Sequence, residues 1–301
     1  MLLEQVSPTL LSMPLIICHR ILEKLEPDDR LIIRKVCRIL KTSVDNFGLH
    51  YNSIFVKICE STVSMYLLDD ICVYYYDLDD VNLSVTYKGK ETIIQGENFL
   101  KIAFEDLKIV TNETSSLVLH SYDRSGIFAF FISEQGCINV KSIKLNDFSF
   151  KEVLIILPML NAQKLENIEI EYLYDIDNFK QITCLDQWRN AKIIHFYQNS
   201  PGIPIEDLFH IEEFTIYLQN LSVQNAIKIQ DILMESSTFQ KCTLYLRNDD
   251  PIELAKVFLP KYLGGNEHSI KYLTRFTIHC ELLHRVSHFD RSQWKFSISN
   301  E

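Results

Sequence analysis

The first regular pattern of apolar side chains begins at Pro14. Apolar residues recur there at intervals of three and four positions, which places them on one face of a helix. They are Leu15, Cys18, Ile21, Leu22 and Leu25. Ser12 and Pro14 stand where an N-terminal cap and a first-turn proline are favoured, since proline has no backbone N–H to leave unpaired. The pattern predicts an amphipathic helix that ends near Pro27.

A second helical pattern follows Pro27, and Asp28 or Asp29 can cap it. Its apolar positions are Leu31, Ile32, Val36, Ile39 and Leu40, and basic residues occupy the opposite side. A break near Cys37 would divide it in two, which gives three short helices within a helical domain at residues 8–50. So small a domain has little interior of its own, and we therefore expect surplus apolar side chains to meet a partner.

The pattern changes after Tyr51. Residues 72–76 and 83–87 are β-rich, and the turn-forming Lys88-Gly89-Lys90 can join the latter to 92–94 as a hairpin. Residues 96–110 carry apolar side chains at helical spacing. We expect residues 51–135 to form a connecting region of β-hairpin and helix, packed on the repeats that follow.

From about residue 136 to the end of the chain, strand-like and helix-like segments alternate. The strand centres Ile143, Ile168 and Ile193 recur every 25 residues, and the later ones, at Ile216, Leu244 and Ile278, are spaced less evenly. Such alternation is typical of a leucine-rich-repeat-like solenoid or of an open α/β layer. Residues 165–171 alternate strictly between apolar and polar, so one face of the sheet should meet water. The predicted class is α+β or α/β, with an irregular strand-helix repeat domain and a one-sided, curved sheet.

The net charge of the chain disfavours some classes of binding partner. The chain has 30 basic and 40 acidic side chains and a net charge of −10, which disfavours direct binding to nucleic acid or to an anionic membrane surface. The charge does not disfavour binding to a partner protein that itself binds RNA. The apolar runs fall short of the roughly 20 residues that cross a bilayer, no secretory leader is evident, and the eight cysteines are scattered without a CxxC motif. We expect a soluble protein with free thiols, in the cytoplasm or also in the nucleus.

Candidate chemistry is sparse. His279, Cys280, His284 and His288 have zinc-ligand side chains, but the first two end a strand pattern and project to opposite faces. No nucleophile or phosphate-binding motif is present. We expect no metal, no cofactor and no catalytic residue, although a site assembled only in space would leave no local motif.

The N-terminal helices resemble the F-box. Met13-Pro14, Ile21-Leu22, Leu25 and Val36-Cys37-Arg38 stand at the spacing of its Leu-Pro, Ile-Leu, Leu and Val-Cys-Arg pattern. Met13 replaces the usual leucine, and Leu15-Ile16 occupies a stretch where many F-boxes carry an acidic residue. The resemblance implies a hydrophobic surface that binds a Skp-family adaptor and, through it, a cullin. The implied contact residues are Pro14, Leu15, Cys18, Ile21, Leu22, Leu25 and Val36. A helical cap on the next domain and a DNA-reading helix-turn-helix are the alternatives.

The segment 185–192, Leu-Asp-Gln-Trp-Arg-Asn-Ala-Lys, resembles the FTH domain of nematode F-box proteins, which typically has Leu-Glu-Gln-Trp-Lys followed by Ala-Lys. The signature residues are Leu185, Gln187, Trp188 and Ala191. We expect them to be structural, because a lone tryptophan before a strand usually packs in the core.

With an FTH domain over residues 136–301 behind an F-box, the chain is identified as a member of the nematode F-box A group. The resemblance implies a non-catalytic, substrate-recruiting subunit of a Skp–cullin–F-box ubiquitin ligase, whose C-terminal domain binds an unknown target protein. A ubiquitin-independent protein-interaction scaffold is the alternative, and an enzyme with a pocket among the helices is the third hypothesis.

Overall fold

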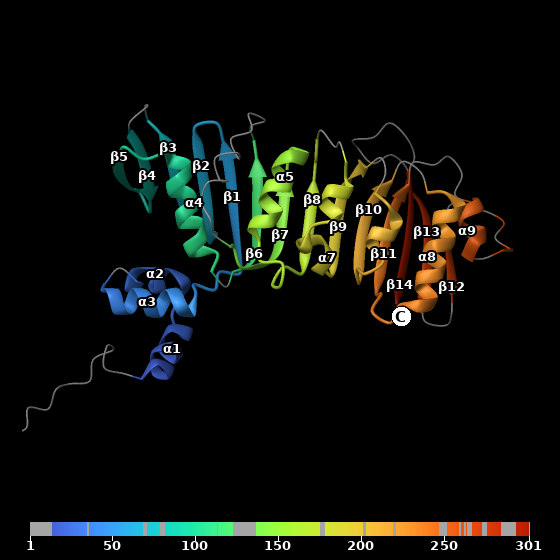
Figure 1. Cartoon of the computed structure of the whole chain (residues 1–301), viewed down its shortest axis with the longest axis horizontal. Helices are drawn as coiled ribbons and strands as arrows, with labels where there is room; N and C mark the ends of the chain where they lie inside the picture. The colour runs from blue at the N-terminus through green and yellow to red at the C-terminus, as the bar shows by residue number, and fades with distance from the viewer. Residues whose placement is uncertain are drawn as a thin grey trace, which may run out of the picture. The chain divides into compact units, whose positions relative to one another are not determined.

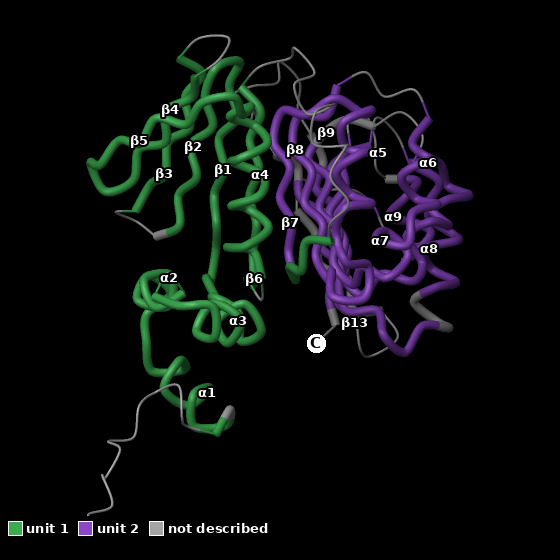
Figure 2. Tube along the Cα trace, turned by 60° about the vertical axis from the view of Figure 1, so that its left-hand side comes forward, with its two compact units in different colours: residues 1–123, 127–141 green, residues 124–126, 142–301 purple. Residues whose placement is uncertain are grey.

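The computed structural model describes residues 14–34, 36–68, 71–78, 82–112, 114–122, 137–174, 178–200, 203–218, 221–246, 252–258, 260–261, 263, 267–272, 276–283 and 293–300. The chain divides into two compact units (Figure 2). Unit 1 comprises residues 1–123 and 127–141, and unit 2 comprises residues 124–126 and 142–301.

Unit 1 begins with the helices α1 (Leu15–Glu23), α2 (Pro27–Arg34) and α3 (Arg38–Phe47) (Figure 1). The three helices predicted from the apolar spacing are confirmed. The start of the second differs, because Pro27 is its first residue and both aspartates lie in its first turn instead of capping it. Proline suits that position, and acidic side chains there complement the helix dipole. The small core of these helices includes Cys18, Leu22, Leu40 and Val44.

The rest of unit 1 is a sheet backed by one helix. Its strands are β1 (Ser53–Cys59), β2 (Thr62–Leu68), β3 (Ile71–Asp77), β4 (Asn82–Tyr87), β5 (Lys90–Gln95) and β6 (Thr114–Ser121), in the order β6-β1-β2-β3-β4-β5. β1 and β6 are parallel, and the other pairs are antiparallel. Helix α4 (Phe99–Val110) packs on β2 and β3, and the Asn98 side chain caps it by accepting from the backbone N–H groups of Leu100 and Lys101. The predicted hairpin at Lys88-Gly89 is confirmed.

Unit 2 is a mixed sheet with helices. It contains β7 (Val140–Asn146, which starts in unit 1), α5 (Phe150–Ile156), η3 (Leu157–Met159), β8 (Asn167–Glu171), α6 (Lys180–Thr183), α7 (Asp186–Asn190), β9 (Ile193–Ser200), η4 (Ile205–Leu208), β10 (Glu213–Leu218), α8 (Val223–Glu235), β11 (Lys241–Leu246), α9 (Ile252–Phe258), β12 (Glu267–Tyr272), β13 (Phe276–Leu283) and β14 (Gln293–Asn300). Strands β7 to β11 are parallel neighbours in chain order, and β14, β13 and β12 follow β11 as antiparallel neighbours.

The parallel strands bury one face. A register row of side chains crosses β7 to β11, each at most 1% exposed: Leu145, Ile170, Phe196, Ile216 and Leu244. On β7 and β8 the residues between them, such as Lys144 and Glu169, are only partly buried, whereas Thr215 on β10 and Thr243 on β11 are buried as well. This alternation supports the predicted one-sided sheet, whereas a leucine-rich-repeat-like curvature stays a prediction. One expectation is wrong: β13, with Ile278, does not continue the parallel repeat after β11, because β14 inserts between them with antiparallel pairing.

Among the described residues, no helix is both long enough and apolar enough to cross a membrane.

Candidate interaction surfaces

The residues expected to contact an adaptor divide into buried and exposed groups. Leu22 and Cys18 are only 3% and 8% exposed, because both lie in the core of the N-terminal helices. Ile21 and Leu25 are half-buried, Pro14 is exposed, and Val36 is 68% exposed. Leu15 starts α1, but its side chain lies outside the described residues.

The exposed apolar side chains of α1 to α3 are isoleucines that are not among the contact residues implied by the F-box resemblance. They are Ile16, Ile17, Ile32 and Ile39, and the exposed fractions of Ile16, Ile32 and Ile39 are close to 60%. Ile16 stands in the stretch noted above as unusually apolar, which was the one sequence signal for it. Exposed apolar residues concentrated on one small domain are typical of a protein–protein contact surface.

Beneath this surface, buried polar groups fix the helices to the strand that follows. Arg30 is 6% exposed and donates to the backbone oxygens of Leu22 at 2.8 Å and Leu49 at 2.5 Å. Its guanidinium also lies 5.1 Å from the ring centre of Phe47, and burial lowers the pKa of Arg30. Each of these contacts joins a different part of the helical domain, so Arg30 sets the arrangement on which the exposed residues depend.

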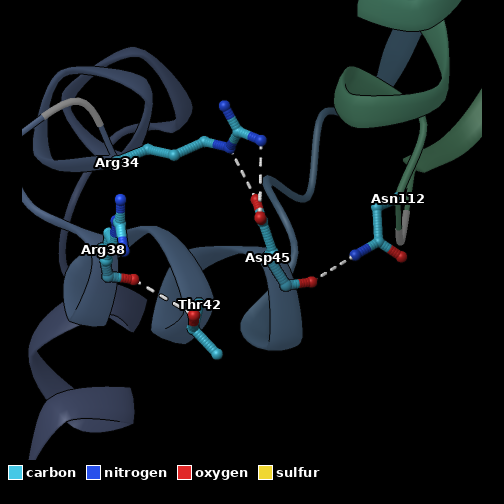
Figure 3. A network of polar contacts seen from close by, with 5 residues as sticks. All are labelled: Arg34, Arg38, Thr42, Asp45 and Asn112. Carbon is cyan, nitrogen blue, oxygen red and sulfur yellow. Dashed lines mark hydrogen bonds and ion pairs between the residues drawn. The ribbon is translucent and has the colours of Figure 1, made fainter.

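A second network joins α2, α3 and the residue pair after α4 (Figure 3). Arg34 Nε and Nη2 donate to the Asp45 carboxylate at 2.5 and 3.4 Å. Asn112 Nδ2 donates to the backbone oxygen of Asp45 at 2.6 Å. A two-point arginine–carboxylate contact fixes orientation better than a single bond does, so the helices have a defined place on the sheet of unit 1.

The tryptophan signature is part of the core of unit 2. Trp188 is fully buried, packs edge-on against Phe179 with ring centres 5.4 Å apart, and donates through Nε1 to the backbone oxygen of Asp207 at 3.2 Å. Gln187 Nε2 donates to the buried backbone oxygen of Leu160 at 2.8 Å. Ala191 is buried, and Leu185 is half-buried. These residues join α7 to segments before and after it in the chain and present no contact surface.

The uncovered face of the unit 2 sheet carries a row of tyrosines. Tyr217 and Tyr245 stack with ring centres 4.3 Å apart, and Tyr197 meets Tyr217 edge-on at 6.0 Å. Burial, followed by the neighbouring Tyr245 and Tyr197, raises the pKa of Tyr217 to about 12. Half-buried tyrosines combine a large apolar area with a polar tip, which is a composition common at protein interfaces.

Charged side chains lie beside this tyrosine row on the same face. Lys144 donates to Glu169 at 2.8 Å and to Glu171 at 2.9 Å. These hydrogen bonds raise the pKa of Lys144 against the opposing effect of burial, which is the largest single influence on it. The lysine is therefore a fixed cation already shared by two carboxylates.

Catalytic and metal chemistry finds little support in the described residues. A cavity of about 530 Å³ in unit 2 is lined by residues such as Glu212, Ser237 and Lys241, and one of about 270 Å³ in unit 1 is lined by residues such as Asp45, Lys108 and Cys137. Neither lining combines a nucleophile with a histidine base. The described parts of the chain hold no group of three or more potential metal ligands. Of the four zinc-type residues considered above, only His279 has a described side chain.

Two parts of the chain match known protein families. A family model of the F-box domain matches residues 10–52, and a model of the FTH domain matches residues 126–261. The chain is 26% identical over 293 residues to F-box A protein 224 of Caenorhabditis elegans, an alignment that covers 88% of this chain and 74% of that protein. Neither family match is a catalytic domain. The chain therefore carries an F-box followed by an FTH domain, and it is similar to a nematode F-box A protein.

Proposed function

We propose that this protein is a substrate-recruiting subunit of a Skp–cullin–F-box ubiquitin ligase. The F-box would bind a Skp-family adaptor, the FTH domain would bind a target protein, and other subunits would transfer ubiquitin. The observation that carries the proposal is the set of exposed apolar side chains on α1 to α3, above a polar network that is itself well satisfied. Leaving so much apolar surface in water is unfavourable unless a partner covers it.

The contact residues implied by the F-box resemblance would have different roles, depending on how far each is exposed. Pro14 and Val36 would contact the adaptor directly, together with exposed isoleucines such as Ile32 and Ile39. Cys18 and Leu22 would support the surface from below, since their side chains are already packed in the core. Ile21 and Leu25 are half-buried and would lie at its margin.

The target protein would bind the uncovered face of the unit 2 sheet. Its stacked tyrosines offer broad contact area at low conformational cost. The described helices α5 to α9 lie over the other face, whose side chains are buried (Figure 1).

Co-expression with a Skp-family adaptor tests the proposal. The two proteins should co-elute on size exclusion, and Val36→Asp should abolish co-elution, because burying an unpaired carboxylate in an apolar contact is costly. Ile93→Asp is the matched control: Ile93 is 60% exposed on β5, outside the F-box, so its replacement should leave co-elution unchanged. Co-elution that survives Val36→Asp would refute the assigned surface, and absence of any complex with the unmodified chain would refute the ligase role.

A further inference from the structure

The sheet of unit 1 also has a face that no described helix covers, and aromatic side chains fill it. Helix α4 packs on the opposite face, where Val63, Met65 and Tyr75 are buried. The uncovered face of β6, β1, β2 and β3 carries Phe55, Tyr66, Tyr74, Tyr76 and His120, and Tyr122 follows β6. Tyr122 is 57% exposed.

The rings form a continuous surface across the strands. Phe55 on β1 pairs with Tyr66 on β2, and their ring centres lie 5.6 Å apart. His120 lies 6.5 Å from Phe55 and stacks on Tyr122 at 4.1 Å. So much aromatic area on a sheet face, partly exposed to water, is characteristic of a binding surface more than of a monomer's free exterior.

One lysine stands in the middle of these rings. Lys57 Nζ lies 5.7 Å from the ring centre of Phe55, 5.4 Å from that of Tyr66 and 5.8 Å from that of Tyr122. Among the described residues it forms no ion pair, and the uncovered faces of β6, β1, β2 and β3 present no carboxylate in their described parts. Lys57 is therefore a cation that is held by cation–π contacts and still able to accept an anionic partner.

We propose that this surface, defined by Phe55, Lys57, Tyr66, His120 and Tyr122, binds an acidic, aromatic peptide segment of a partner protein. A glutamate or aspartate of the segment pairs with Lys57, and its neighbouring aromatic or proline side chains lie on the exposed rings. A charge-assisted hydrogen bond inside an apolar surround is stronger than one in open water. The arrangement selects for a carboxylate flanked by apolar residues.

Single-stranded nucleic acid suits this surface less well. Proteins that bind it combine stacking rings with a basic groove that follows several phosphates. The described residues of β6, β1, β2 and β3 place one lysine on this face, in a chain of net charge −10. A protein segment needs only one anionic group, and Lys57 provides for one.

The site lies outside both domains recognised by similarity. Its residues fall between the F-box match at 10–52 and the FTH match at 126–261. It is thus separate from the adaptor surface and from the tyrosine row of unit 2, and it does not depend on either of them.

The test is a fluorescence-anisotropy titration of the full chain with a labelled Ser-Pro-Phe-Glu-Phe-Pro-Ser peptide and its Gln counterpart. We expect the Glu peptide to bind about tenfold more tightly than the Gln peptide, which corresponds to one good charge-assisted contact. Lys57→Met should remove that preference, and Lys57→Arg should preserve it. Lys101→Met, which removes a lysine from α4 on the other side of the sheet, is the matched control and should preserve the preference too.

Tyr122→Ser should weaken both peptides equally, since it removes a ring and leaves the charge. Circular dichroism of each variant shows whether the fold is intact, and the exposed position of Tyr122 makes that variant the safer one. Equal affinities for the Glu and Gln peptides, an unchanged preference in Lys57→Met, or no detectable binding would overturn the proposal. So would labelled oligouridine that binds more tightly than the Glu peptide and depends on Lys57, because the surface would then serve nucleic acid.

Discussion

Lys88, in the turn between β4 and β5, donates a hydrogen bond to the carboxylate of Asp28 in α2 over 2.8 Å. The residues are 60 positions apart in the chain, so this contact ties the F-box helices to the sheet of the same unit. The Asp28 carboxylate also accepts from Tyr51 Oη at 3.1 Å. Burial, and after it the charge of Asp28, raises the pKa of Tyr51.

Replacing Asp28 should loosen the F-box from its support. Asp28→Ala leaves the buried Tyr51 hydroxyl without its acceptor, and such a loss costs about 1–3 kcal/mol of the free energy of unfolding. Asp29→Ala is the matched control, because Asp29 is exposed in the same helical turn. Urea unfolding followed by circular dichroism measures both. Equal midpoints for the two variants would contradict a structural role for Asp28, and Lys88→Met should have a smaller effect because half of that lysine side chain is exposed.

Mutations in the core and on the surface of the F-box should differ in their effect on stability. Leu22→Ala opens a cavity in the core and should lower the free energy of unfolding by about 2–5 kcal/mol. Ile32→Ala removes an exposed side chain and should change it by less than about 0.5 kcal/mol. Adaptor affinity should fall for both, in Leu22→Ala through unfolding and in Ile32→Ala with the fold intact. A thermal melt beside the binding measurement distinguishes them; comparable melting temperatures would mean that Leu22 is not in the core.

Leu22 and Ile32 also show how much of the structure a helical sequence pattern predicts. Spacing identified Leu22 and Ile32 alike as apolar helix positions, and both helices were predicted correctly. It could not tell which side chain meets the protein's own core, because that depends on how three short helices pack against one another. Leu22 is buried and Ile32 is 60% exposed, a difference that only the tertiary arrangement decides.

The strands show the same limit. Residues 165–171 alternate strictly, which predicts a strand around Ile168, and β8 (Asn167–Glu171) lies within them. β1 and β2 were missed, since the turn Glu60-Ser61 that joins them contains none of the Gly or Asn signals of a tight hairpin. The insertion of β14 beside β11 was not predictable from spacing either, because it rests on pairing between residues such as Leu244 and Phe296 that are far apart in sequence.

The tryptophan signature should behave as a core element. Trp188→Phe removes the hydrogen bond from Nε1 to the Asp207 backbone oxygen and leaves unfilled space beside Phe179. We expect a loss of about 2–4 kcal/mol in the free energy of unfolding of unit 2. Tyr172→Phe, at a ring that is 63% exposed in the same unit, is the control and should be close to neutral. If Trp188→Phe keeps full stability but loses target binding, the residue is a contact instead.

His195 should make unit 2 sensitive to acid. It lies on the uncovered face of β9, and its Nδ1 is buried without a hydrogen-bond partner among the described residues. Burial lowers the pKa of His195 from its ordinary value of 6.5; the nearby Glu169 and Glu213 oppose that shift, and Lys241 and Lys144 add to it. The folded state therefore favours the neutral ring, and the net effect of these four charges does not reverse the direction.

Because the folded pKa is the lower one, the contribution of His195 to stability is present above pH 6.5 and is lost as the pH falls below that value. The urea midpoint of unit 2 should accordingly drop between about pH 7.5 and about pH 5.5, a range in which histidine titrates. His195→Gln cannot take up the proton, so its midpoint should fall less over the same range. The difference between the two slopes isolates His195 from other titrating groups, and parallel slopes would show that its ring is solvated in the folded protein.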